Sequence, residues 1–345
     1  NTGNGALRLS RDGIHHYMHN RRHRCTRISA APFDPDAPAA RFQRFMREVL
    51  PDDETCRWVQ KWLGYSLCGD IGEQRIAFFE GGGANGKSTL IDLIADVLGD
   101  YSALAPIRML LHDDRSNGSG PTPDIARLPG ARFVRTSEPQ PGARLSEEVI
   151  KQITGGEKLL ARHLNRPFFE FRPAFKVTVS VNVRPSLVGK DHGIRRRIVI
   201  VPFKQRFEPG SDPTLNADLR REMPGVLNWL LDGLRLYFEE GLRDLPPEIR
   251  QATDEYFAEQ DPIGVSIMET CDNDPNACET VGDLFAAHKL WCSQAGEEPR
   301  KLTQFGRRLS DMGYRKRKTD GRIVREGLRI KPEWRPVHGG IDDDE

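Results

Sequence analysis

The sequence predicts an α/β fold in which a glycine loop joins a buried parallel strand to a helix. Residues 76–79 form a short apolar run of the kind that a buried parallel strand needs. Apolar residues then recur at helical spacing from Leu90 to Leu98. Between the two stands Gly81-Gly82-Gly83-Ala84-Asn85-Gly86-Lys87-Ser88, which fits G-x-x-x-x-G-K-[ST] at every fixed position. The order strand, glycine loop, helix predicts a P-loop.

This loop predicts a site for a nucleoside triphosphate. Because glycines lack side chains, the backbone N–H groups of the loop and the N-terminus of the next helix can face the phosphates. Lys87 is expected to reach the β and γ phosphates, and Ser88 to place its hydroxyl on Mg²⁺. Thr89 completes the expected nucleotide site, so the expected cofactors are ATP and Mg²⁺. A glycine-rich turn that binds nothing is the alternative.

The composition limits the class of protein. A chain of 345 residues is long enough for two or three domains. It has no apolar run approaching the ~18 residues of a membrane span and no apolar signal peptide core. The six cysteines form no C-x-x-C pair, which is typical of free thiols in a reducing compartment. We expect a soluble intracellular protein with no membrane partner. Because the chain opens with Asn1, we expect it to be a fragment of a longer protein.

Two segments precede the apolar strand. Residues 1–40 are rich in Arg, His, Pro and Ala without a regular period, which predicts an irregular leader with one hairpin near Asp12-Gly13. Residues 41–72 show two apolar stripes at helical spacing, separated by Pro51-Asp52-Asp53. We expect these two helices to form a small helical collar, which either packs subunits together or supports the domain that follows.

Polar side chains end two further predicted strands. Glu138 follows the short strand that begins at 133, and Asn182 ends the alternating run 175–182. A P-loop hydrolase needs a carboxylate to orient the attacking water, while Lys87 and Mg²⁺ neutralise the charge that develops. Glu138 is therefore the expected catalytic carboxylate, and Asn182 is expected to sense the γ-phosphate. Taken alone, a glutamate at a strand end is more often a surface residue.

Three arginines, Arg195-Arg196-Arg197, run into the apolar strand 198–201. Arginine is costly to bury unpaired, and its planar fork suits phosphate. We therefore expect this run to meet phosphate, with a surface cluster of salt bridges as the alternative. With these elements the expected ATPase core covers residues 73–208.

Between Glu138 and Asn182, two short β-type runs flank a polar tip, which predicts a hairpin over residues 158–171. The tip carries Arg162, His163, Asn165 and Arg166. These side chains suit contact with nucleic acid phosphates. An ordinary hairpin without a ligand is the alternative.

The C-terminal part combines helices with a basic segment. Residues 209–261 predict lid or linker helices, and 262–336 predict small helices followed by a charged hairpin. That hairpin contains Arg315-Lys316-Arg317-Lys318, and residues 300–335 hold thirteen Lys and Arg against four Asp and Glu. Helices followed by a basic hairpin indicate a winged-helix-like domain that binds DNA, with a solvated basic face as the alternative. Residues 337–345 predict an acidic tail.

Taken together, these motifs resemble the superfamily 3 helicases, in particular the primase-helicases of phages, plasmids and poxviruses. The resemblance rests on the order of G-x-x-x-N-G-K-S, the strand ending in Ser-Glu, K-x-x-T-G-G-E, the strand ending in Asn and R-R-I-x-x-x-P-F, and it spans roughly Asn4 to Trp334. It implies an AAA+ core, a hexameric ring, movement on single-stranded DNA and an arginine finger from a neighbouring subunit, carried by Arg196 or Arg197. Many members have two adjacent acids where this chain has Ser137-Glu138. Ser88 and Glu138 are therefore the expected metal contacts, with the second one open.

The resulting expectation is an ATP-dependent DNA helicase that acts on single-stranded and forked duplex DNA during replication of a phage, prophage or plasmid. It is expected to form a homo-oligomer in the cytoplasm of a bacterial host, with a primase domain possible upstream. Two alternatives stay open. One is a P-loop ATPase switch that hydrolyses ATP without moving along DNA, and the other is an initiator that binds duplex DNA at an origin.

Overall fold

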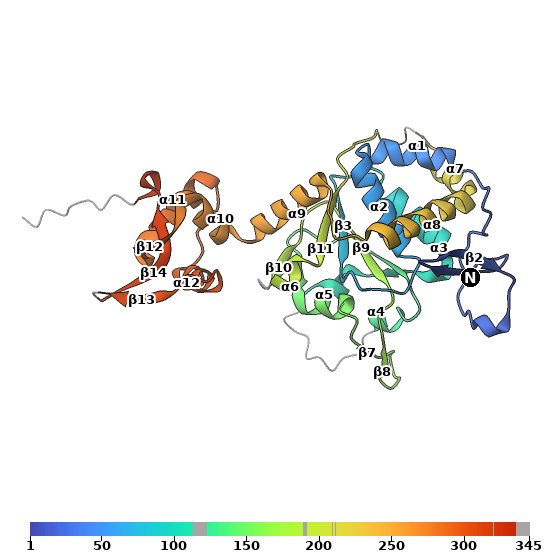
Figure 1. Ribbon diagram of the computed structural model, residues 1–345, viewed down its shortest axis with the longest axis horizontal. Coiled ribbons are helices and arrows are strands. Elements are labelled where there is room, and N and C mark those ends of the chain that lie inside the picture. Colours follow the sequence, from blue (N-terminus) through green and yellow to red (C-terminus); the bar gives the residue numbers. More distant parts are fainter. Residues whose placement is uncertain (113–122, 189–191, 209, 211, 320, 336–345) are drawn as a thin grey trace, which may run out of the picture. The chain divides into compact units, whose positions relative to one another are not determined.

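The computed structural model describes residues 1–112, 123–188, 192–208, 210, 212–319 and 321–335. The chain forms two compact units, Asn1–Tyr256 and Phe257–Glu345 (Figure 1). The boundary falls within helix α9 (Pro247–Gln260). The expected acidic tail, 337–345, lies outside the described residues.

A parallel sheet of five strands forms the centre of the first unit. Its strands are β3 (Ile76–Glu80), β4 (Ser102–Ala105), β5 (Phe133–Thr136), β9 (Lys176–Val181) and β11 (Ile198–Pro202). They lie in the order β11-β3-β9-β5-β4, and each neighbouring pair is parallel. All five residues of β11 are buried, as expected for a strand covered on both faces. The α/β fold with a parallel sheet is confirmed.

Several helices share one hydrophobic core with this sheet, and Ile249 of α9 also belongs to it. Five others contribute more of it. They are α1 (Ala40–Val49), α2 (Asp53–Tyr65), α3 (Lys87–Leu98), α7 (Leu215–Arg221) and α8 (Met223–Glu240). The Asp52 carboxylate caps α2 by accepting a hydrogen bond from the Thr55 backbone N–H at 2.8 Å. Trp62 of α2 donates its indole N–H to the Thr178 hydroxyl of β9 at 2.9 Å. Figure 1 shows these helices grouped beside the sheet.

This shared core includes parts of two segments outside the expected ATPase core. We expected 41–72 to form a helical collar that packs subunits together or supports the next domain, and 209–261 to form lid or linker helices. In the structure, Phe42 of α1, Trp58 of α2 and Leu230 of α8 belong to the same buried cluster as Phe79 of β3. The apolar faces of α1, α2 and α8 cover one face of the sheet, so these three helices belong to the same unit as the sheet.

The other elements of the first unit connect or extend this core. The expected hairpin near Asp12-Gly13 is present as β1 (Ala6–Ser10) paired with β2 (Gly13–Tyr17). The others are η1 (Arg21–His23), η2 (Gly99–Tyr101), η3 (Ile107–Leu110), α4 (Pro123–Ala126), β6 (Arg144–Ser146), α5 (Glu147–Thr154), β7 (Leu159–Ala161), β8 (Phe169–Phe171), β10 (Ser186–Val188) and α6 (His192–Arg195).

The second unit has its own small core. Its elements are α10 (Pro262–Thr270), β12 (Cys271–Thr280), α11 (Val281–Ala295), α12 (Leu302–Asp311), β13 (Lys316–Thr319), β14 (Arg322–Ile330) and η4 (Pro332–Trp334). The strands form an antiparallel sheet in the order β12-β14-β13. Phe305 and Leu309 of α12 are fully buried with Leu328 of β14. The guanidinium of Arg325 also fastens β14 to α12 through the Ser310 hydroxyl at 2.9 Å.

Candidate functional site

Three loops meet at the carboxyl ends of adjacent parallel strands. The glycine loop, residues 81–86, follows β3, Glu138 lies two residues past the end of β5, and Asn182 directly follows β9. Because β3, β9 and β5 are neighbours and parallel, their carboxyl ends share one edge of the sheet. The sheet order therefore brings Lys87, Glu138 and Asn182 together.

Two glycines of the loop have no room for a side chain. A Cβ at Gly81 would lie 2.1 Å from Asn85 Nδ2 and 2.4 Å from the Phe203 carbonyl oxygen. Gly86 has φ of +83°, and a Cβ there would lie 2.4 Å from Val49 Cγ1 of α1. The loop thus lies between α1 and Phe203, the residue directly after β11, and α3 begins directly after the loop at Lys87.

Lys87 is a buried cation held by uncharged oxygens. Its side chain is 2% exposed, and Nζ donates to the Gly81 carbonyl at 2.6 Å, to Asn182 Oδ1 at 3.0 Å and to Asn85 Oδ1 at 3.1 Å. Burial lowers the pKa of Lys87, while the nearby carboxylates Glu138 and Glu80 raise it. None of its hydrogen bonds recorded for the described residues ends on a carboxylate, so the ammonium is well placed to receive an anion.

Asn182 links this cation to the expected catalytic carboxylate. Its backbone N–H donates to one oxygen of Glu138 at 2.9 Å, and its side-chain amide donates to the other at 3.0 Å. The amide oxygen of the same residue accepts from Lys87. Glu138 is otherwise exposed, so its carboxylate can reach solvent. The sequence predicted these three residues as separate positions and did not predict the hydrogen bonds that connect them.

Ser88 and Thr89 occupy the first turn of α3. Ser88 is exposed and Thr89 is half-buried. A hydroxyl oxygen on Ser88 and a carboxylate on Glu138 are the hard oxygen ligands that suit Mg²⁺, which usually takes one or two protein oxygens and completes its shell with phosphates and water. No group of three or more His, Cys, Asp or Glu able to hold a metal occurs in the described residues.

Sequence reasoning missed an ion pair at the same edge. Glu80, the last residue of β3, accepts from Arg184 Nε at 2.5 Å and from Nη2 at 2.9 Å. Both side chains are less than 20% exposed. Because the Glu80 carboxylate is paired with Arg184, it attracts the Lys87 ammonium less strongly. A charged residue immediately before the glycine loop was the only signal in the sequence.

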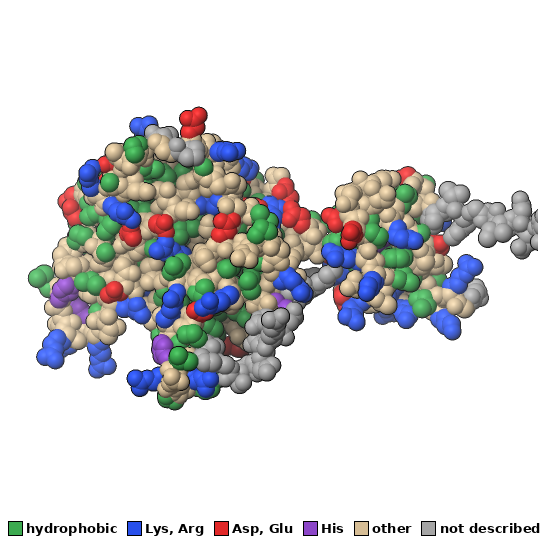
Figure 2. Space-filling view, turned by 180° about the vertical axis from the view of Figure 1, so that it is seen from behind, with side chains coloured by type: hydrophobic (Ala, Val, Ile, Leu, Met, Phe, Trp, Pro, Cys, Tyr) green, Lys and Arg blue, Asp and Glu red, His purple; other side chains and the backbone are tan. Residues whose placement is uncertain are grey.

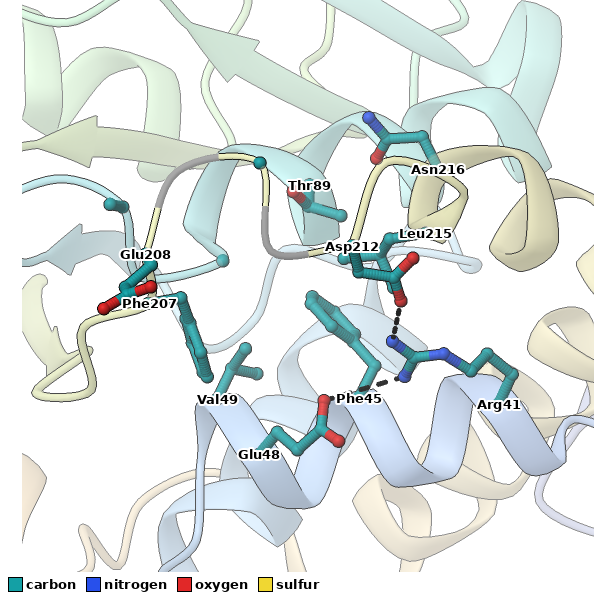
Figure 3. Close-up of a pocket in the computed structure, with 13 residues that line it drawn as sticks. Arg41, Phe45, Glu48, Val49, Thr89, Phe207, Glu208, Asp212, Leu215 and Asn216 are labelled. Atoms are coloured by element: carbon teal, nitrogen blue, oxygen red, sulfur yellow. Dashed lines mark hydrogen bonds and ion pairs between the residues drawn. The ribbon is translucent and has the colours of Figure 1, made fainter.

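A pocket beside the glycine loop was also missed. Its volume is about 260 Å³, and it lies between α1, the first turn of α3 and the segment that follows Phe207 (Figure 3). Phe45 and Val49 of α1 form apolar walls together with Phe207. At the rim, Arg41 lies 2.9 Å from an Asp212 oxygen and 3.6 Å from Glu48. Ala84, Gly86 and Thr89 line the side toward the glycine loop.

The three arginines before β11 have different surroundings. Arg197 is 8% exposed and donates to the Gly193 carbonyl at 2.6 Å, the Thr154 hydroxyl at 3.1 Å and the Gln74 side chain at 3.2 Å. Arg196 is exposed and donates to Gln74 at 3.3 Å. Arg195 is exposed and pairs with Asp254 at 3.0 Å. Of the two arginines expected to act between subunits, Arg196 alone has an exposed side chain.

The expected hairpin is present as β7 paired antiparallel with β8. It extends from the body of the first unit in Figure 1. His163, Asn165 and Arg166 are exposed at its tip, and Arg162 is half-buried. The tip turns at Asn165, which has φ of +56°.

The basic run of the second unit lies on and just before β13. Arg315, Lys316, Arg317 and Lys318 are all exposed, and Arg317 lies 3.6 Å from Glu326 of β14. Figure 2 shows Lys and Arg side chains gathered along one side of this unit. The predicted charged hairpin is thus present.

Comparisons with known proteins find viral proteins named as helicases and primases that are similar to this chain. A family described as D5 N terminal like matches residues 1–51. A proposed helicase of Acanthamoeba polyphaga mimivirus is 28% identical over 290 residues, which cover 77% of this chain and 30% of that protein. A proposed helicase of Frog virus 3 is 27% identical (77% and 29%), and a proposed primase of African swine fever virus is 25% identical (84% and 32%). The chain spans about a third of the length of these relatives.

A solved structure shares the fold. The apo structure of the NrS-1 C-terminal region (305–718) matches with a TM-score of 0.57 at 13% identity, covering 87% of this chain and 77% of that one.

The resemblance to superfamily 3 primase-helicases is confirmed. The curated relatives come from viruses named for an amoeba, a frog and swine, so they do not support the bacterial host that we expected. No helix in the described part of the chain is long and apolar enough to cross a membrane.

Proposed function

We propose that this chain is the helicase part of a viral or plasmid replication protein, which hydrolyses ATP to move along single-stranded DNA and to separate a forked duplex. The observation that carries the proposal is Lys87, a buried cation whose hydrogen bonds end on uncharged oxygens. A buried charge that makes no direct hydrogen bond to an opposite charge is costly, and a bound anion lowers that cost. The phosphates of a nucleotide at the N-terminus of α3 supply that charge.

The neighbouring residues have complementary roles in this proposal. Glu138 orients the attacking water and accepts its proton, because its carboxylate is held from one side by Asn182 and is open to solvent. Asn182 reports the state of the γ-phosphate, since it contacts both Lys87 and Glu138. Ser88, Glu138 and the phosphates would hold Mg²⁺, which neutralises charge on the phosphate oxygens when it is bound.

The pocket beside the glycine loop is the proposed place for the base and ribose of the nucleotide. Its position next to Gly86 and Thr89 is within reach of a nucleotide whose phosphates lie on the loop. Phe45, Val49 and Phe207 offer apolar surface to a base, and the Arg41–Asp212 pair offers polar groups at the rim.

The proposed assembly is a homo-oligomeric ring, by resemblance a hexamer, in which Arg196 acts as a finger on the neighbouring nucleotide. Its exposed side chain supports this choice over Arg197. The hairpin tip contacts single-stranded DNA, and the second unit, which has the chain order helix, strand, two helices and two strands, is a winged-helix-like DNA-binding domain. An upstream primase domain is compatible with the partial coverage of the viral relatives.

The exposed basic run on a separate unit favours a second candidate, an initiator that binds duplex DNA and uses ATP only to control assembly. Strand displacement on a 3′- or 5′-tailed duplex distinguishes the two. The wild type should hydrolyse ATP and release the displaced strand, and Lys87→Ala should do neither. Hydrolysis without strand release, together with a footprint on one duplex sequence, would replace the helicase by the initiator.

A further inference from the structure

The hairpin formed by β7 and β8 carries an exposed aromatic ring beside a guanidinium. Phe168 is 43% exposed, and the Arg162 guanidinium carbon lies 4.5 Å from the centre of its ring. Ala161 pairs with Phe169 in the ladder, so Arg162 and Phe168 follow as opposed positions at the next step. The two side chains therefore face each other across the hairpin, where the tip begins.

The ring lies on the outward face of the hairpin. Side chains alternate between the two faces of a strand. Leu159 and Ala161 are buried, whereas Leu160 between them is 57% exposed. Arg162 and Phe168 share the face of Leu160, and Leu164 at the tip is 68% exposed. A ring that packed against the body of the unit would lie on the opposite face of the hairpin, with Leu159.

The surroundings of the ring are cationic. Residues 157–172 contain four Lys and Arg and two Glu, and one of the two, Glu170, is paired with Lys158 at 2.7 Å. Figure 2 shows cationic, His and hydrophobic side chains together at this protruding end of the larger unit. Apolar surface among positive charges matches a polyanion that also presents flat apolar faces, which describes single-stranded nucleic acid.

We propose that Phe168 and Arg162 form a stacking platform for a base of single-stranded DNA. This proposal rests on the proposed function and adds a base contact to the expected phosphate contacts. The guanidinium covers one face of the ring and holds it in place by a cation–π contact, so the exposed part of the ring receives the base. Such stacking tolerates any sequence, because every base has a flat π face.

Two fluorescent probes of equal length test the platform: oligothymidylate and an oligonucleotide with the same number of phosphates but abasic sugars. Anisotropy titrations with the full chain should give wild-type affinity roughly 5- to 150-fold higher for oligothymidylate, the range for one stacked base. Phe168→Leu should lose most of this preference, and Phe168→Tyr should keep it. The matched control is Leu164→Ala, which removes exposed apolar surface without a ring and should keep the preference.

Salt dependence separates the platform from the phosphate contacts. Phe168→Leu removes no cation, so the slope of log affinity against log salt should equal the wild-type slope. The platform is refuted if the wild type binds both probes equally, or if Phe168→Leu weakens both by the same factor, which would mean that the ring only shapes the hairpin. A changed oligomer size in Phe168→Leu would assign the ring to a subunit contact instead. Failure of the wild type to bind either probe would refute the proposed function itself.

Discussion

The Lys87 cation that follows the glycine loop and the polar side chains at the tip of the β7–β8 hairpin have opposite surroundings. Lys87 is 2% exposed and is held by three uncharged oxygens, whereas His163 and Arg166 are exposed at the hairpin tip. A buried cation is fixed in place by the fold, and its loss changes either stability or chemistry. An exposed cation acts through its charge alone, so salt screens it. The two regions should therefore respond differently to substitution, pH and salt.

The largest effect is expected next to the buried cation, at Glu138. Glu138→Gln keeps the shape of the side chain, and its amide oxygen can accept one of the two hydrogen bonds that Asn182 donates to the carboxylate, so nucleotide should still bind. The amide cannot accept a proton, so ATP turnover should fall by roughly 10²- to 10⁴-fold. Steady-state hydrolysis and binding of a fluorescent ATP analogue measure the two quantities. Glu170→Gln on the hairpin is the control, and hydrolysis by Glu138→Gln at the wild-type rate would show that another group activates the water.

The second prediction concerns another buried cation, Lys176 of β9. Its ammonium donates to the Cys68 and Asp70 carbonyls and lies 4.3 Å from the centre of the Tyr65 ring. Burial lowers the pKa of Lys176 from 10.5 to about 8. Between about pH 8 and 10.5 the unfolded chain therefore binds a proton that the folded chain does not, so this lysine makes the protein more stable as pH rises through that window.

Lys176→Met removes this contribution. The unfolding free energy of Lys176→Met minus that of the wild type should fall by roughly 3 kcal/mol as pH rises from about 8 to 10.5, because the wild type gains stability over this range. Denaturant unfolding across this range measures it. Lys158→Met, at an exposed site on the hairpin, controls for the loss of one positive charge. A difference that stays constant with pH would show that Lys176 titrates alike in the folded and unfolded chains.

The third prediction compares two neighbouring arginines, the buried Arg197 and the exposed Arg196. Arg197 resembles Lys87 in its burial, and its contacts join β11 to Thr154 at the end of α5 and to Gln74 before β3. Arg197→Ala should lower the free energy of unfolding by about 2–3 kcal/mol, because the Thr154 hydroxyl, the Gly193 carbonyl and the Gln74 amide oxygen all lose the guanidinium that donates to them. Arg196→Ala should change it by less than about 0.5 kcal/mol. Thermal or denaturant unfolding measures both.

Activity distinguishes the same two arginines in a second way. Arg196→Ala should fold normally and lose hydrolysis. When it is mixed with Lys87→Ala, some activity should return, since a mixed ring contains interfaces with an intact loop and an intact finger. If rings form and no mixing ratio restores activity, the finger does not act between subunits.

Local patterns in the sequence were enough for much of the fold. The strands β3, β9 and β11 appeared as apolar or alternating runs, and the β7–β8 hairpin as two runs around a polar tip. Lys87 was predicted from the glycine-loop motif, and Glu138 and Asn182 from their places after predicted strands. Their hydrogen bonds required the order of strands in the sheet, which no local pattern contains.

Contacts between distant segments could not be predicted. The Arg41–Asp212 pair at the rim of the pocket joins residues 171 positions apart, and the Glu80–Arg184 pair joins residues 104 apart. Burial of Arg197 was missed for the same reason, because its partners come from two other elements. The helices over the sheet were recognised by their apolar stripes, but a stripe does not say which surface it covers.

The smallest effect on ATP hydrolysis is expected at the exposed polar side chains of the hairpin tip. His163 and Arg166 lie away from the hydrogen-bonded chain of Lys87, so His163→Ala combined with Arg166→Ala should keep basal ATP hydrolysis. It should lose stimulation by single-stranded DNA and strand displacement. Each lost phosphate contact should also reduce the slope of log affinity against log salt by up to about one unit. The control is a variant of the second unit, Lys316→Ala with Lys318→Ala, which should weaken DNA loading while loaded rings still translocate. If the hairpin variant displaces strands normally and only the second-unit variant fails, the exposed cations that matter lie on β13, and the initiator becomes the better assignment.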